Sequence, residues 1–379
     1  LEEEASNREA GTWTAAVEAA LADMWVTVAV SAGDEAAGLA AHANQIGAHH
    51  APDLFHVQHP LWQALVRPLA QNLEDPAAAR AAAAESTKAW FEHREAYRQG
   101  PRSPGRPPDF ERHIAAAQDA EAAAGLTLAA AVKLKDDVYA AIRSLGTAYH
   151  PVNPSTGACR DADTVGAELN AAMAILKGAA DSIGLSEKRR ALIAKASRVL
   201  PKMVATITFF HAELSRQLAA LALPPAVCTY ARSVLIPAAY LSRLAGRAAT
   251  VSQREALPAT RQGLLDAADM TCRSLLSDYQ WWQLEQVVQT CVDLFARSTS
   301  CVEGRNGRLA LWHHYLHRLG SHRLSALTTI HNCWIKHPDG STAAERFFRM
   351  HHADLFESLL DRMDLPVRPS VAPGRARAA

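Results

Sequence analysis

Alanine-rich helical patterning over residues 61–298 constrains the fold of this chain more than any other sequence feature. Runs such as AAARAAAAE at 77–85 favour helix, because alanine loses the least free energy on entering one. The helical stretches predicted along the chain span 12–23, 61–99, 110–148, 164–184, 187–222, 225–247, 253–277 and 280–297. Between two of them lies PRSPGRPPDF (101–110), a Pro/Arg-rich segment that predicts an exposed loop near 100–109. We therefore expect a mainly α-helical protein.

Two short apolar segments near the N-terminus predict strands. WVTVAV (25–30) is β-branched and apolar, and DLFHVQ (53–58) is bounded by prolines. Between them, residues 33–47 have the pattern of a turn followed by a helix. This order of helix, strand, helix and strand is typical of part of an α/β sheet.

The composition excludes several classes of protein. The chain has 39 basic and 39 acidic side chains, so its total charge does not indicate nucleic-acid binding. Its six cysteines form no C-x-x-C pair, which argues against a zinc ribbon or a disulfide framework. No apolar run is long enough to span a bilayer and the N-terminus is acidic, so we expect a cytoplasmic protein without a membrane partner. Phosphate-loop, dinucleotide-binding and serine-hydrolase motifs are also missing from the sequence.

Two acidic residues, Asp34 and Glu303, lie at positions where a carboxylate could bind a metal ion. Asp34 comes just after the first predicted strand, where carboxylates commonly face ligands, although Asp is also a favoured helix N-cap. Glu303 lies in SCVEGRNG (300–307), next to Arg305 and Asn306, which suit phosphate contacts, although a capped turn explains the same pattern. Two metal ions held by acids catalyse phosphoryl transfer in many enzymes.

Histidines and basic residues are weaker candidates for metal ligands and for DNA contacts. Asp53 and His56 are three apart, and in a strand they point to opposite faces, so a strand end or bulge is needed to bring them together. His313 and His317 are spaced as a helical metal pair, but without an H-E-x-x-H motif. Cations that suit DNA phosphates, and equally a solvated helix face, are Lys188, Arg189, Arg190, Arg308, Arg318 and Arg323.

Four ordered strings carry a resemblance to a known family. They are VSAGDEAAGL (30–39), HHAPDLFHVQH (49–59), SCVEGRNGRL (300–309) and HNCWIKHPDGSTAAERFF (331–348). Together they resemble bacterial DDE-type transposases and transposase-derived proteins of mobile elements, whose catalytic domain has an RNase H-like fold. The resemblance implies DNA recombination at transposon ends, with Mg²⁺ or Mn²⁺ as cofactor.

The resemblance also implies site residues and domains. Asp34 would be the second acid and Glu303 the third, both catalytic and metal-binding, and Asp53 and His56 would match a (C/D)-x-x-H element. Residues 1–60 and 299–348 would be parts of the RNase H-like domain, interrupted by a helical insertion at 61–298. Residues 349–379 would be a terminal helix and a disordered tail.

The first acid of the family has no counterpart in this chain. The resemblance places it before residue 1, so we expect an N-terminally truncated chain that is inactive alone. The remaining alternatives are a non-catalytic helical protein that binds DNA or protein, and a zinc hydrolase built on the histidines. A homodimer is expected from the family alone.

Overall fold

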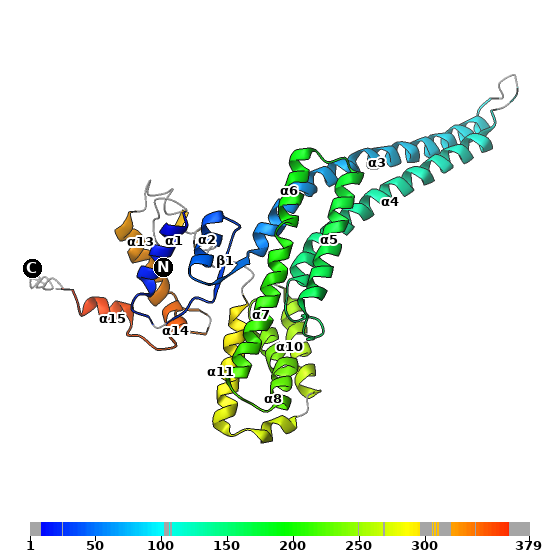
Figure 1. Cartoon of the computed structure of the whole chain (residues 1–379). Helices are drawn as coiled ribbons and strands as arrows, with labels where there is room; N and C mark the ends of the chain where they lie inside the picture. The colour runs from blue at the N-terminus through cyan, green and yellow to red at the C-terminus, as the bar shows by residue number, and fades with distance from the viewer. Residues whose placement is uncertain are drawn as a thin grey trace, which may run out of the picture. The chain divides into compact units, whose positions relative to one another are not determined.

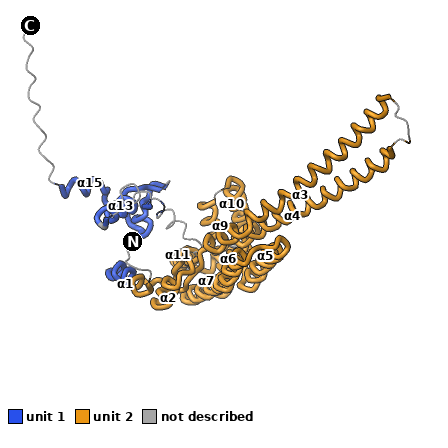
Figure 2. Tube along the Cα trace, turned by 90° about the horizontal axis from the view of Figure 1, so that it is seen from above, with its two compact units in different colours: residues 1–8, 15–25, 301–379 blue, residues 9–14, 26–300 orange. Residues whose placement is uncertain are grey.

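The computed structural model describes residues 9–24, 26–101, 106, 108–248, 250–267, 270–295, 305, 307, 309–310, 320–337 and 339–363. The chain forms two compact units, coloured separately in Figure 2. Unit 2 contains residues 9–14 and 26–300, and unit 1 contains residues 1–8, 15–25 and 301–379. The expectation of a mainly helical protein with a small α/β part is confirmed.

A small β–α–β motif opens unit 2. Strands β1 (Val30–Gly33) and β2 (His49–Pro52) pair in parallel, with Val30 opposite His49 and Gly33 opposite Pro52. Parallel strands need a crossover connection, and helix α2 (Ala37–Gln45) provides it. The expected turn and helix at 33–47 are therefore confirmed.

Both predicted strands were misplaced. Residues 26–29 lie outside β1, and residues 54–58 belong to helix α3 (Leu54–Gln99). Strand β1 is short because its partner β2 has only four residues before Asp53 caps α3. Residues 54–58 are helical because Val57, Leu61 and Leu65 recur every four residues and are almost fully buried.

Most of unit 2 is a helical bundle with a continuous hydrophobic core. Its elements are α4 (Phe110–Ala148), α5 (Ala162–Ser182), α6 (Glu187–Ser197), α7 (Leu200–Ala220), α8 (Pro225–Tyr230), the π-helical turn η1 (Ala231–Leu235), α9 (Ile236–Ala245), α10 (Val251–Asp266), the 3₁₀ turn η2 (Met270–Leu275) and α11 (Asp278–Leu294). Tyr149, Phe210 and Tyr240 each pack edge-on against Phe295 in this core. The predicted helix 110–148 is confirmed to the residue.

Three predicted helices are divided in the structure. The stretch 187–222 splits into α6 and α7, because Pro201 occupies the first turn of a new helix, where its missing N–H costs nothing. The stretch 225–247 splits into α8, η1 and α9, with Pro237 again in a first turn. The stretch 253–277 splits into α10 and η2.

Helices α3 and α4 run side by side and extend beyond the other helices of unit 2 (Figure 1). The bundle core uses α3 only up to Leu69 and α4 only from Val138. Beyond those residues, the two helices pack on each other. Near the tip of this arm, Trp90 stacks on His113 with ring centroids 4.4 Å apart.

The described part of unit 1 contains residues 15–21 of helix α1 (Ala10–Leu21), together with α13 (Ser321–Cys333), α14 (Ala343–Phe348) and α15 (Leu355–Leu360). An isolated antiparallel bridge joins Lys336 to Thr342. Residues 349–379 are expected to form a terminal helix and a disordered tail. Helix α15 lies within this segment, and residues 364–379 lie outside the described part. Across the described helices of both units, none is long and apolar enough to cross a membrane.

Candidate functional site

Asp34 directly follows β1, as the sequence predicts. Its Oδ1 accepts a hydrogen bond from the backbone N–H of Ala36 at 3.3 Å, which forms a tight local turn. Asp34 does not cap α2, because the N-cap position belongs to Ala36. Among the residues that the structure describes, no cation forms an ion pair with Asp34. Its half-buried carboxylate is therefore available to a ligand at the carboxyl end of the strand.

Glu35, His50 and Lys202 form a polar cluster at the same end of the sheet, which the sequence analysis did not single out. Glu35 Oε1 lies 3.8 Å from His50 Nε2. The other carboxylate oxygen, Oε2, accepts a short hydrogen bond from the ammonium of Lys202 on α7. The cluster therefore ties the loop after β1 to both β2 and the bundle.

His49, the first residue of β2, faces α7. Its Nε2 lies 2.9 Å from Thr206 Oγ1, and its ring stacks on Phe209 with centroids 4.6 Å apart. Burial lowers the pKa of His49, and the neighbouring His50 lowers it further. His49 therefore favours the neutral form and fixes the sheet to the bundle.

Asp53 and His56 do lie on one side of the chain, because they occupy the start of a helix rather than a strand. Asp53 is buried, and its Oδ1 accepts a hydrogen bond from the backbone N–H of Phe55 at 2.9 Å. His56 Nε2 lies 3.9 Å from Asp53 Oδ2. The expectation of opposite faces was wrong, since residues three apart are neighbours on a helix.

The predicted basic cluster on α6 is partly used by the fold. Arg189 donates to the backbone carbonyl of Ala64 at 3.2 Å, which links α6 to α3. Arg190 donates to the carbonyl of Leu185 at 2.8 Å and pairs with Asp181. Lys188 is exposed and has no ion-pair partner among the described residues.

Most of the candidates in the C-terminal part lie outside the described residues. These are Glu303, Asn306, Arg308, Arg318, His313 and His317. Arg305 is half-buried in a helical turn, and Arg323 is exposed on α13. Within the part of the chain that the structure describes, no three His, Cys, Asp or Glu side chains are grouped to hold a metal ion.

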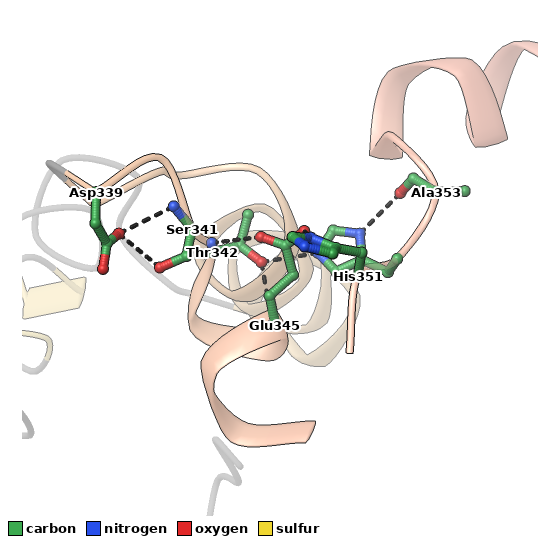
Figure 3. A network of polar contacts seen from close by, with 7 residues as sticks. Asp339, Ser341, Thr342, Glu345, His351 and Ala353 are labelled. Carbon is green, nitrogen blue, oxygen red and sulfur yellow. Dashed lines mark hydrogen bonds and ion pairs between the residues drawn. The ribbon is translucent and has the colours of Figure 1, made fainter. Parts of the chain in front are cut away.

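A polar network organises the start of α14 in unit 1 (Figure 3). Thr342 and Glu345 form a capping box, in which each side chain accepts from the backbone N–H of the other residue. His351 Nδ1 lies 2.9 Å from Glu345 Oε1, and His352 Nε2 lies 2.8 Å from Thr342 Oγ1. The backbone N–H of Thr342, followed by His351, lowers the pKa of Glu345 to about 2.

Comparison with known proteins gives one family match. The model of a family of unknown function, DUF6399, matches residues 231–375, which is less than half of the chain. The matched segment includes the position of Glu303 but not that of Asp34. No curated protein and no solved structure matches the chain.

Proposed function

We propose that this chain is a DDE transposase-like protein, built for metal-dependent phosphoryl transfer on DNA. The observation that carries the proposal is the order of elements around Asp34. An acid at the carboxyl end of β1 is followed by a crossover helix, a parallel strand and then directly by a long helical region. An RNase H-like domain with a helical insertion after its second acid requires that order.

In this proposal Asp34 and Glu303 hold Mg²⁺ or Mn²⁺. Carboxylate oxygens are the ligands that these cations prefer, and the carboxylate of Asp34 is not neutralised by a described cation. A bound metal ion would supply charge stabilisation to the attacking and leaving oxygens. Asp53 caps the helix that follows β2, and His56 lies 3.9 Å from its carboxylate. Arg305 and Asn306 are candidate phosphate contacts next to Glu303.

The first acid of a DDE triad has no assigned residue in this chain. With two acids instead of three, we expect weak metal binding and no strand cleavage by this chain alone. DNA contacts would come from Lys188 and from the C-terminal cations Arg308, Arg318 and Arg323. Homodimerisation belongs to the same proposal through the family resemblance.

Iron-mediated cleavage of the protein tests the pairing of the two acids. Fe²⁺ replaces Mg²⁺, and ascorbate with peroxide generates radicals that cut the backbone near bound iron. We expect cuts beside residues 34 and 303, suppressed by excess Mg²⁺. Asp34→Asn should abolish the cut beside residue 303, whereas Asp119→Asn on the exposed arm should not. A cut beside residue 303 that persists in Asp34→Asn would disprove the shared site.

A second candidate function is a non-catalytic helical protein that binds DNA or protein. The arm of α3 and α4 favours it, because most of its surface is not used by the bundle core. Fluorescence anisotropy with labelled duplex DNA separates the two candidates. DNA binding that falls with salt but ignores Mg²⁺ and Mn²⁺ favours the second, and metal-dependent binding lost in Asp34→Asn favours the first.

A further inference from the structure

His50 and Glu35 carry buried polar atoms that have no hydrogen-bond partner in the structure. The His50 side chain is 8% exposed, and neither ring nitrogen has a hydrogen bond among the described residues. Glu35 Oε1 is also buried without one and lies 3.8 Å from His50 Nε2. Buried polar atoms in native proteins nearly always have a partner, an ordered water or an ion. This pair therefore has hydrogen-bonding and metal-binding capacity that the described protein groups do not use.

The surroundings direct both groups toward each other. Lys202 engages Glu35 Oε2, which leaves Oε1 facing the imidazole. Gly33 lies against the ring, since a Cβ at that position would be 3.4 Å from His50 Cε1 and 3.1 Å from a methyl of Leu39. A Cβ at Gly33 would press on Leu39 and reach ordinary contact distance of the ring, so the backbone of β1 packs closely beside His50.

We propose that His50 and Glu35 together bind a first-row divalent cation such as Zn²⁺. Imidazole nitrogen and carboxylate oxygen are both common zinc ligands. Tetrahedral coordination with bonds of about 2.1 Å places two ligand atoms about 3.4 Å apart, so a small side-chain movement closes the observed separation. With only two protein ligands the site is weak, and water or a substrate oxygen completes the coordination.

The charge of Lys202 distinguishes cation binding from a purely structural role of His50 and Glu35. Its ammonium shares the Glu35 carboxylate with the incoming cation, so the two positive charges repel each other at short range. Removing the charge of Lys202 therefore strengthens cation binding. A purely structural role for the His50–Glu35 pair predicts no such gain.

Titration of the whole, tag-free chain with Co²⁺ and Zn²⁺ tests the site. The difference in visible Co²⁺ absorption between wild type and His50→Ala isolates this site from other ligands in the chain, and calorimetry with Zn²⁺ gives the affinity. We expect His50→Ala and Glu35→Gln to weaken binding by about tenfold or more, the scale seen even for outer-shell changes at metal sites. Lys202→Met should strengthen it.

His59 provides the matched control for His50. His59→Ala removes an exposed histidine of α3 and should leave binding unchanged. Circular dichroism confirms that each variant remains folded. Equal binding by wild type and His50→Ala, or Lys202→Met binding no tighter than wild type, would overturn the proposal. The site uses neither Asp34 nor Glu303, so the iron-induced cut beside residue 303 should survive in His50→Ala, and the two proposals can fail separately.

Discussion

The carboxylate of Asp53 accepts a hydrogen bond from the backbone N–H of Phe55, with Oδ1 and N 2.9 Å apart, at the junction of β2 and α3. This contact ends the sheet and begins the longest helix, which has 46 residues. Asp53→Ala should lower the free energy of unfolding by about 1 kcal/mol, because a helix N–H loses its cap. Asp53→Asn keeps an acceptor and should cost less. Denaturant unfolding followed by circular dichroism measures both, and equal losses would contradict the capping role.

Shortening the arm should leave the bundle folded. Replacing residues 84–119 by a short Gly/Ser turn removes the outer parts of α3 and α4, which lie outside the bundle core. The ion pair between Arg80 and Glu121 remains to close the shortened hairpin, with Nη2 and Oε1 3.0 Å apart. We expect less helical signal in circular dichroism but an unchanged midpoint of chemical unfolding. A large fall in that midpoint would show that the outer arm stabilises the bundle.

Arg160 is a buried cation that satisfies the end of α4. Its Nη1 donates to the carbonyl of Thr147 at 2.9 Å and to that of Ala148 at 3.3 Å, and its Nη2 pairs with Glu168. Arg160→Met should lower the free energy of unfolding by about 1–3 kcal/mol, because it removes both hydrogen bonds to the end of α4 and the ion pair with Glu168.

Arg198→Met is the matched control for Arg160→Met. The exposed Arg198 donates only within its own helical turn, to the carbonyl of Ala194. Its loss should leave stability nearly unchanged. Denaturant unfolding of the two variants should therefore differ clearly, and similar values would rule out the role given to Arg160.

Acid should weaken the start of α14 through Glu345. The pKa of this carboxyl falls from 4.5 to about 2, first because of the backbone N–H of Thr342 and then because of His351. A lowered folded pKa means that the stabilisation is complete above the ordinary value of 4.5 and is lost as pH falls toward 2. Carbon-13 NMR of the Glu345 carboxyl should show a midpoint near 2.

His351→Ala tests the cause of that shift. It should raise the pKa of Glu345 while leaving it below the ordinary value, because the contact with the backbone of Thr342 remains. The same carbon-13 titration measures it. An ordinary pKa in His351→Ala would mean that the capping box does not hold the charge.

The helical spacing of apolar residues predicts most of the fold. How accurately the ends of each helix are predicted depends on the prolines and loops that flank it. Helix 110–148 is located correctly because a Pro-rich loop precedes it and Pro151 follows it soon after its end. The stretch 53–58 is misread because its Leu, Phe and Val suit a strand as well as a buried helix. Only the continuation of the pattern to Leu61 and Leu65 distinguishes them.

The candidate site shows the limit of local patterns more clearly. The position of Asp34 after a strand is predicted from the sequence, because a β-branched apolar segment precedes it. The pairing of Glu35 with His50 and Lys202 is not, because it depends on the register of β1 with β2 and on the packing of α7 beside them. Such contacts join distant parts of the chain, and no spacing rule in the sequence indicates them.

In the basic cluster on α6, Lys188 and Arg189 should have different roles, one in DNA binding and the other in stability. Lys188 is exposed, so Lys188→Ala should leave stability unchanged. If α6 contacts DNA phosphates, the slope of log affinity against log salt should fall by about 0.9 for the lost contact. Arg189→Ala should instead lower stability by about 1 kcal/mol, because its guanidinium donates to the carbonyl of Ala64. Anisotropy titrations at several salt concentrations, paired with unfolding curves, measure both effects. A salt slope unchanged in Lys188→Ala would remove α6 from the DNA-binding surface.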